Sequence, residues 1–350
     1  MSQVRPMSPV TVAPEPPSPS DLFKLLHFSQ SVSWRATATF IWLFLLAGAA
    51  GALAWYGNSV SDTFLCRERL ETTWTAAIPA MILVGPMALV MLSGGLDFST
   101  AGVAVLASMV TALCLGDGMS PEMTFLYAML AAGGVGLLHG ILVSVALVNP
   151  VILTLLSMLL LASGTPFFLG DQYTIEFGQN PGFIKDLHNS PIVLAVSAGV
   201  SLLLIQLAQI RGGACGLPVS RRSWTRRTFC VCLPYVLCSL AAGIVGSSLA
   251  ASTGRGSRGA SDDVSIFVVL AALLGGNCTG RRFGTVIGAA AGVAIFAAMQ
   301  NLLLMEGTAP DTILFILACA AAGGLLLSQL VYGFMNLLYR KSRIKRQAMV

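Results

Sequence analysis

The segment Gly94–Ser99, which reads Gly-Gly-Leu-Asp-Phe-Ser, gathers groups that could do chemistry. Its two glycines lower the cost of unwinding a helix, and Asp97 and Ser99 bring a carboxyl and a hydroxyl group to the same place. An ionisable residue beside a helix break inside a membrane is a functional-site hypothesis by default. Asp97 and Ser99 either brace the break and cap the next helix or contact a substrate, and the two roles can coexist.

A second break of the same kind follows the apolar run 264–274, at Gly275 and Gly276. Glycines then recur at every fourth position, which predicts one helix face for close packing, at Gly284, Gly288 and Gly292. Gln300 and Asn301 lie at the far end of that helix. Buried amides are costly unless hydrogen-bonded, so they either bind another helix or line a pathway.

Enzymatic chemistry has little support in the sequence. The three histidines have no serine or cysteine constellation at hydrolase spacing, and no G-x4-G-K-[ST] loop is present to cradle ATP phosphates. The cysteine pair Cys230 and Cys232 has the wrong spacing for a zinc knuckle and no nearby histidine. We therefore expect no catalytic residue, no metal and no cofactor.

Composition indicates a membrane protein, since 55% of the residues are hydrophobic and 10% are charged, against about 25% charged in soluble domains. No lysine or arginine occurs from Leu70 to Ile184, and each would cost about 2.5–3.5 kcal/mol at the centre of a spanning helix. The sequence predicts an all-α membrane protein with helices interrupted near Gly94 and Gly275. About ten spanning segments are expected, at 37–57, 74–93, 99–116, 122–148, 150–170, 190–208, 229–250, 263–280, 284–305 and 311–338.

The basic residues predict the orientation. With both termini in the cytoplasm, ten crossings place 15 of the 20 lysines and arginines inside and 5 outside, as the positive-inside rule requires. Residues 1–34 are expected to form a disordered Pro-rich tail, in which Asp21–Trp34 is either an interfacial helix or a lead-in to the first span. Residues 35–338 would form the transmembrane domain, and 339–350 a basic cytoplasmic tail.

The loop Arg211–Thr228 is predicted to be cytoplasmic. Its arginines, Arg221 and Arg222 among them, need no role beyond anchoring the topology. Gly216–Val219 (Gly-Leu-Pro-Val) is a small apolar knob within this basic loop, and such a knob suits insertion into a groove on a soluble partner.

These features resemble the membrane permeases of bacterial ABC importers of the ribose/xylose/galactose type. The family's GG-[IL]-D-[LF]-S segment is Gly94–Ser99 here, and its P-x-[FI]-[IL]-x-T-L segment is similar to Asn149–Leu155, with Thr154 as the threonine. Its A-x2-x-G-I-x-V docking element looks like Ala214 to Val219. Its LGG-x7-G-x3-G-x3-G helix with a later Gln-Asn pair matches Leu274, Gly275, Gly276, Gly284, Gly288, Gly292, Gln300 and Asn301.

The resemblance implies a permease subunit in the bacterial cytoplasmic (inner) membrane. Its expected partners are cytoplasmic ATPase subunits, a second permease copy or a paralogue, and an extracytoplasmic solute-binding protein; nucleic acid is not expected. Docking on the ATPase would fall to Gly216, Leu217, Pro218, Val219, Arg221 and Arg222. The substrate pathway would include Gly94, Gly95, Asp97, Ser99, Asn149, Thr154, Gly275, Gly276, Gln300 and Asn301.

The chain departs from the family pattern at Thr100–Ala101 and at Arg281–Arg282, and its cytoplasmic loop is shorter. These departures leave the substrate open between a monosaccharide, which we expect first, and a nucleoside or riboflavin. An ion- or proton-coupled secondary transporter is the alternative. It would need an acid or base relay, for which the spans offer Asp97 and His139.

Overall fold

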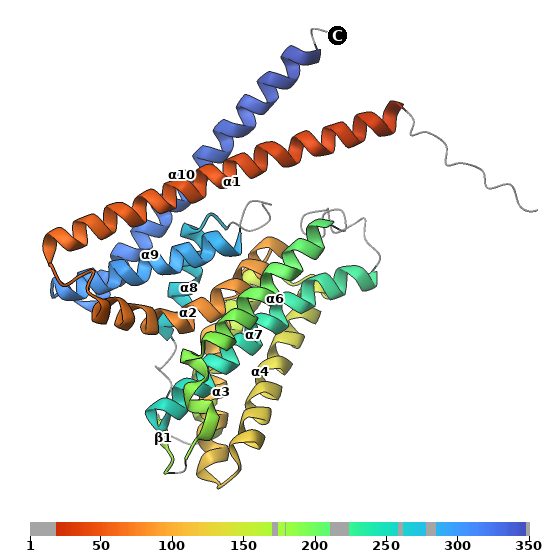
Figure 1. Cartoon of the computed structure of the whole chain (residues 1–350). Helices are drawn as coiled ribbons and strands as arrows, with labels where there is room; N and C mark the ends of the chain where they lie inside the picture. The colour runs from red at the N-terminus through yellow and green to blue at the C-terminus, as the bar shows by residue number, and fades with distance from the viewer. Residues whose placement is uncertain are drawn as a thin grey trace, which may run out of the picture.

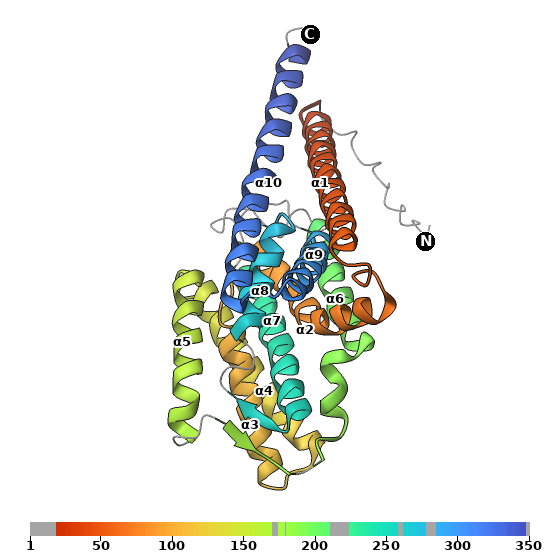
Figure 2. The same ribbon diagram turned by 90° about the vertical axis from the view of Figure 1, so that its left-hand side faces the viewer.

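The computed structural model describes residues 19–169, 174–178, 180–210, 224–257, 262–277 and 285–347. Within these ranges the chain is almost entirely helical (Figures 1 and 2). A two-stranded antiparallel ribbon pairs β1 (Thr174–Glu176) with β2 (Arg255–Ser257), and a short 3-10 helix, η1, covers Gly182–Asn189. The α-helices are α1 Pro19–Val60, α2 Arg67–Ser93, α3 Thr100–Gly116, α4 Pro121–Ser144, α5 Pro150–Leu169, α6 Pro191–Ile210, α7 Trp224–Thr253, α8 Asp262–Leu274, α9 Val286–Met305 and α10 Pro310–Gln347.

The helices form two groups that share α2. In one group α3, α4 and α7 pack on each other, with α5 against α3; in the other α8 and α9 pack together with α1 and α10 against them. Helix α2 contacts α7 on one side and α8 and α9 on the other. Figure 1 shows α1 and α10 crossing at one end of the molecule, while α3, α4 and α7 extend to the opposite end beside the β-ribbon. Because α2 lies between the two groups, it is buried from Ala77 almost to its end.

A hydroxyl group of α6 replaces a backbone hydrogen bond that a proline removes from α2. Pro86 has no N–H group, so the carbonyl of Ile82, four residues earlier, loses its partner within the helix. The Ser197 hydroxyl on α6 donates to that carbonyl at 2.6 Å. Gly85, next to the proline, faces Ser201 of α6 with no room for a side chain, since a Cβ there would lie 2.9 Å from the hydroxyl oxygen. Proline and glycine together fix where α6 docks.

Among the described residues, six helical segments are long and apolar enough to cross a membrane: Thr37–Val60, Arg67–Ser93, Pro121–Ser144, Val231–Thr253, Val286–Met305 and Pro310–Tyr339. This confirms an all-α, multi-pass membrane protein. Thr100–Gly116 and Pro150–Gly164 are apolar but shorter. The count of ten crossings and the cytoplasmic placement of both termini stay predictions.

Some predicted boundaries differ from the structure. The span predicted at 122–148 ends earlier, at Ser144. Leu147 leaves the helical region with a positive φ of 58°, and Pro150 disfavours helix at the residue before it, Asn149. The span predicted at 263–280 ends at Leu274, where glycines follow. At the N-terminus, the segment from Asp21 to Trp34 is continuous with the first long helix, while the Pro-rich residues 1–18 lie outside the described ranges.

Candidate functional site

The predicted break at Gly94 is present and has a defined geometry. Helix α2 ends at Ser93, and Gly94 takes a left-handed conformation with φ 101°. The Gly94 N–H donates to the Met91 carbonyl and the Gly95 N–H to the Val90 carbonyl, each at 3.1 Å. This pair of bonds is the Schellman arrangement, which satisfies carbonyl groups at a helix end and favours glycine at the left-handed position.

Asp97 braces the turn that follows. The side chain is fully buried, and its Oδ1 accepts the Ser99 N–H at 2.9 Å and the Ser99 hydroxyl at 2.5 Å. Ser99 stands at the N-cap of α3, yet its own side chain makes no capping bond to that helix. The carboxylate therefore holds the chain between the two helices, as the bracing interpretation predicts, and substrate contact by Asp97 stays a prediction.

The hydrogen bonds continue from the break to two other helices. The Ser99 hydroxyl lies 3.3 Å from His139 Nδ1, and His139 Nε2 lies 2.7 Å from the Ser157 hydroxyl. We call Asp97, Ser99, His139 and Ser157 the enclosed cluster, because the first three are buried and the fourth is half-buried. It links the break to α4 and α5 through hydrogen bonds, while Asp97 Oδ2 is buried with no partner among the described residues.

Tyr235 of α7 forms a wall of this region. Its fully buried ring meets the His139 imidazole edge-on, with centroids 6.5 Å apart. Gly95 lies directly against the Tyr235 hydroxyl, so that any Cβ at Gly95 would collide with the hydroxyl oxygen. Within the described part of the chain this hydroxyl has no hydrogen-bond partner. Gly95 is thus required because the Tyr235 hydroxyl leaves no room for a side chain, whereas Gly94 is required because of its left-handed backbone conformation.

Two further predicted residues lie at the start of α5. The buried Thr154 hydroxyl is 2.8 Å from the Pro150 carbonyl and 3.2 Å from the Leu96 carbonyl, so it can join α5 to the break. Asn149 is exposed, and its Oδ1 accepts the Val151 N–H at 3.0 Å in the manner of a helix cap. The structure brings Thr154 to the break and leaves Asn149 outside it.

The second predicted break repeats the first. After α8 the Gly276 N–H donates to the Leu273 carbonyl at 3.0 Å and the Asn277 N–H to the Ala272 carbonyl at 3.1 Å, with φ 83° at Gly276. The Asn277 amide also reaches the Thr285 carbonyl, 3.3 Å away, and so bridges the end of α8 and the start of α9.

Glycines bring α8 and α9 into close contact. A Cβ on Gly275 would collide with the backbone of Gly288, and one on Gly292 would collide with the Ala271 carbonyl. The packing role predicted for Gly288 and Gly292 is visible in these contacts, and Gly275 shares it. Gly284 lies outside the described residues.

Gln300 and Asn301 line a cavity between α2 and α9, with a volume of about 270 Å³. Asn301 Nδ2 donates to the Thr73 hydroxyl at 2.8 Å, so this amide both binds a neighbouring helix and lines a cavity. Gln300 is exposed in the cavity. We call this space the α2–α9 cavity; it is lined by Thr72, Thr73, Ala76, Ala77, Ala80, Phe267, Ala297, Gln300, Asn301 and Leu304.

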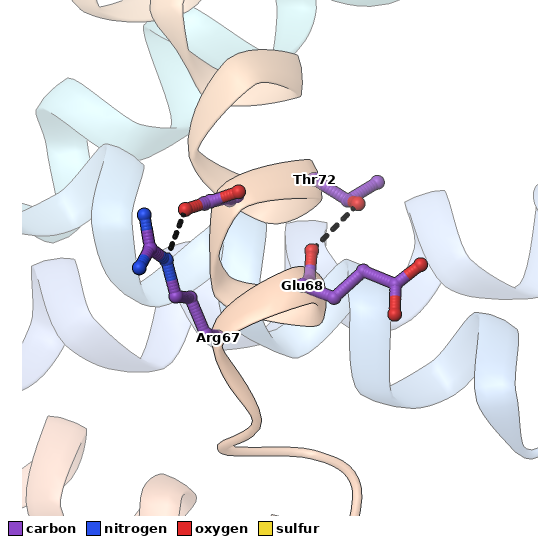
Figure 3. Close-up of polar contacts among 4 residues, drawn as sticks. Arg67, Glu68 and Thr72 are labelled. Carbon is purple, nitrogen blue, oxygen red and sulfur yellow. Dashed lines mark hydrogen bonds and ion pairs between the residues drawn. The ribbon is translucent and has the colours of Figure 1, made fainter.

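Polar contacts in the first turns of α2, just before the lining residues Thr72 and Thr73, are shown in Figure 3. Arg67 Nε donates to Glu71 Oε1 at 2.7 Å, and the Thr72 hydroxyl donates to the Glu68 carbonyl at 2.8 Å. The ion pair joins residues four apart on one exposed helix face, so it lends local helix support of a few tenths of a kcal/mol. Arg67 and Glu71 are thereby paired with each other, while the Thr72 hydroxyl bonds the backbone.

The predicted ATPase-docking residues, Gly216 to Val219 with Arg221 and Arg222, lie outside the described residues. The structure adds groups that sequence reasoning missed: Ser157, Tyr235 and the joining of His139 to Asp97 through Ser99. One signal was available, since His139 is the other ionisable side chain noted within a predicted span. Nothing in the sequence points to Ser157 or Tyr235, because they come from helices distant along the chain.

The described part of the chain is thus a helical membrane fold with a polar, glycine-ended helix break. Residues 69–210 match the family described as branched-chain amino acid transport system / permease component. The galactofuranose transporter permease protein YtfT of Escherichia coli (strain K12) is 27% identical over 249 residues, covering 67% of this chain and 72% of that protein. No solved structure matches the chain. Over these residues the chain is therefore similar to the permease components of membrane transport systems.

Proposed function

We propose that this chain is the permease subunit through which an ABC importer moves a monosaccharide into the cytoplasm. The observation that carries the proposal is the similarity to a galactofuranose permease, which extends over two thirds of the chain. The α2–α9 cavity supports it, because the residues that line it offer hydroxyl and amide groups and carry no charge. A nucleoside or riboflavin is the next substrate to test.

The expected assembly has this chain in the bacterial cytoplasmic membrane, with ten spans and both termini inside. A second permease copy or a paralogue completes the pore, a solute-binding protein delivers the sugar outside, and cytoplasmic ATPase subunits drive the change between access states. The breaks at Gly94 and Gly276 support this role, since irregular backbone at membrane depth is tolerated where protein or a water-filled cavity satisfies it.

Uptake of radiolabelled sugars tests the function. Cells lacking this gene and other routes for the sugar, complemented with the chain and its neighbouring transporter genes, should accumulate galactose, ribose or xylose. Accumulation should stop when ATP is depleted by arsenate and continue when a protonophore collapses the proton gradient in cells that retain ATP. Uptake that follows the proton gradient instead would establish the secondary transporter.

Topology has its own test. In a cysteine-free version of the chain, cysteines placed at Asn180 and Ser257 should react with an impermeant thiol reagent added outside, and one placed at Ser223 should not. Labelling of the Ser223 position from outside would overturn the ten-span arrangement.

The docking role of Gly216–Val219 follows from its chemistry. A glycine permits a tight turn, a proline fixes the backbone, and Leu217 and Val219 would fill an apolar groove on the ATPase. Replacing Leu217 and Val219 by aspartate should release the ATPase and abolish transport while the permease still inserts. Neutralising Arg226 and Arg227 is the control and should do much less, because exposed charges attract at long range without setting the register. Normal co-purification of the aspartate variant would reduce the loop to a topology anchor.

A further inference from the structure

We infer that the α2–α9 cavity is a binding site for one neutral sugar ring on the permease itself, with Gln300 as its main polar contact. This inference rests on the proposed function and adds the place and the chemical class of the bound ligand. It is carried by three observations: the free hydrogen-bonding capacity of the cavity, the absence of charge in its lining, and its size.

The cavity keeps polar groups that the protein does not use. Gln300 has no side-chain hydrogen bond among the described residues, and Asn301 uses Nδ2 on Thr73 while its Oδ1 makes no bond there. A carboxamide carries both donors and an acceptor, as each sugar hydroxyl does, so one amide can bind two neighbouring hydroxyls. Thr72 donates its hydroxyl proton to the Glu68 carbonyl, which leaves its oxygen as an acceptor facing the cavity.

The rest of the lining is apolar and uncharged. Phe267 offers an aromatic ring, held edge-on to Phe296 with centroids 5.9 Å apart, against which the C–H face of a sugar ring can lie. None of the ten lining residues is charged. A phosphate or carboxylate would lose its hydration there with no cation to compensate, so the lining favours a neutral ligand.

The volume sets the size of the ligand. At about 270 Å³ the cavity lies just below the range of about 300–1,000 Å³ typical of sites for drug-sized ligands. A single sugar ring suits this space better than riboflavin, whose fused rings and ribityl chain need more. The Asn301–Thr73 bond spans the same two helices, so a ligand that displaces it would also loosen α2 from α9.

The test compares variants inside and beside the cavity in cells that carry the whole transporter. Gln300→Leu keeps a similar volume and removes the donor and the acceptor of the carboxamide, and it should lower the maximal uptake rate of the transported sugar about tenfold, equivalent to about 1.4 kcal/mol. Thr72→Val should lower it about threefold. Thr75→Val is the matched control: Thr75 lies on the same helix, its hydroxyl also bonds the carbonyl four residues earlier, and it does not line the cavity. Its uptake should equal that of the parent.

Ligand protection gives a second readout that is independent of transport. A cysteine at Leu304, another residue that lines the cavity, in an otherwise cysteine-free chain should be labelled more slowly by a maleimide when millimolar D-galactose, D-ribose or D-xylose is present, and at an unchanged rate with glucose 6-phosphate. Parental uptake by Gln300→Leu at equal membrane abundance, together with no protection, would show that lipid or water fills the cavity and would overturn the inference while the proposed function stands. A parent chain that transports none of these sugars would overturn both.

Discussion

The enclosed cluster and the α2–α9 cavity both hold polar groups among apolar helices, yet they differ in every other respect. The enclosed cluster contains the ionisable pair Asp97 and His139 and is buried except for the half-buried Ser157. Hydrogen bonds join its members, and Asp97 Oδ2 has no partner among the described residues. The α2–α9 cavity contains amides and hydroxyls, is open, and keeps part of its hydrogen-bonding capacity free. The polar groups of the enclosed cluster lie within the packed helices, whereas some of those in the α2–α9 cavity can still bond a ligand.

The difference bears on how functional residues in membrane spans are inferred from a sequence. An ionisable residue in a membrane span attracts attention as a functional site. Here the acid is enclosed and braces a turn, and the better candidate for substrate contact is a neutral amide. Exposure to a ligand therefore separates the two residues more clearly than charge does, because Asp97 is fully buried and Gln300 is exposed.

The largest loss of stability is expected for a substitution at Gly95, beside the enclosed cluster. Gly95→Ala forces a methyl group into the Tyr235 hydroxyl and should destabilise the permease by about 3 kcal/mol, the upper end for an overpacked site. Thermal unfolding in detergent measures this. Adding Tyr235→Phe should recover part of the loss, because it removes the oxygen that collides. A double variant no more stable than Gly95→Ala alone would show that the strain lies elsewhere.

A smaller loss is expected at Asp97. Asp97→Ala removes the acceptor of both Ser99 bonds and leaves buried donors unpaired, at a cost of about 2 kcal/mol. Asp97→Asn keeps an oxygen at the same place and should be milder. Stability and uptake should fall in parallel for the two variants. If uptake collapses in Asp97→Asn while stability is unchanged, Asp97 contacts the substrate, and the contrast with the cavity breaks down.

The smallest effect concerns Ser157. Ser157→Ala removes the bond to His139 Nε2 and should cost about 0.6 kcal/mol, the mean for side-chain hydrogen bonds between membrane helices. Uptake should stay near the parental rate. Ser328→Ala serves as the comparison, since the Ser328 hydroxyl bonds the Leu325 carbonyl within its own helix and ties no second helix. A loss of uptake in Ser157→Ala as large as in Gln300→Leu would place the enclosed cluster in the pathway.

Local features of this fold were predictable from sequence. Glycine pairs after apolar runs predicted helix ends near Gly94 and Gly275, and both are found, because a left-handed residue at a helix end is a property of a few consecutive residues. The four-residue spacing of Gly288 and Gly292 likewise predicted a packing face. The apolar composition was sufficient to predict a helical membrane protein.

Contacts between distant segments were not predictable in the same way. Ser157 meets His139, and Tyr235 meets Gly95, only once the helices have packed. The span predicted at 263–280 was also too long, since α8 has 13 residues, about 20 Å, and ends at Leu274, directly before the glycine pair at which the sequence predicted a break. The sequence left Asn301 either to bind another helix or to line a pathway. In the structure Asn301 bonds Thr73 of α2 and also lines the α2–α9 cavity.

The glycine contact between α8 and α9 has a mechanical consequence. Because Gly275 meets the backbone of Gly288 and Gly292 meets the carbonyl of Ala271, neither helix can slide along the other without driving side chains into main chain. We therefore expect α8 and α9 to move together as one rigid body. Helix α9 is about 30 Å long, with the Asn277 bridge at one end and Gln300 near the other. A tilt of the helix pair at its Asn277 end would therefore displace Gln300 and Asn301 relative to α2.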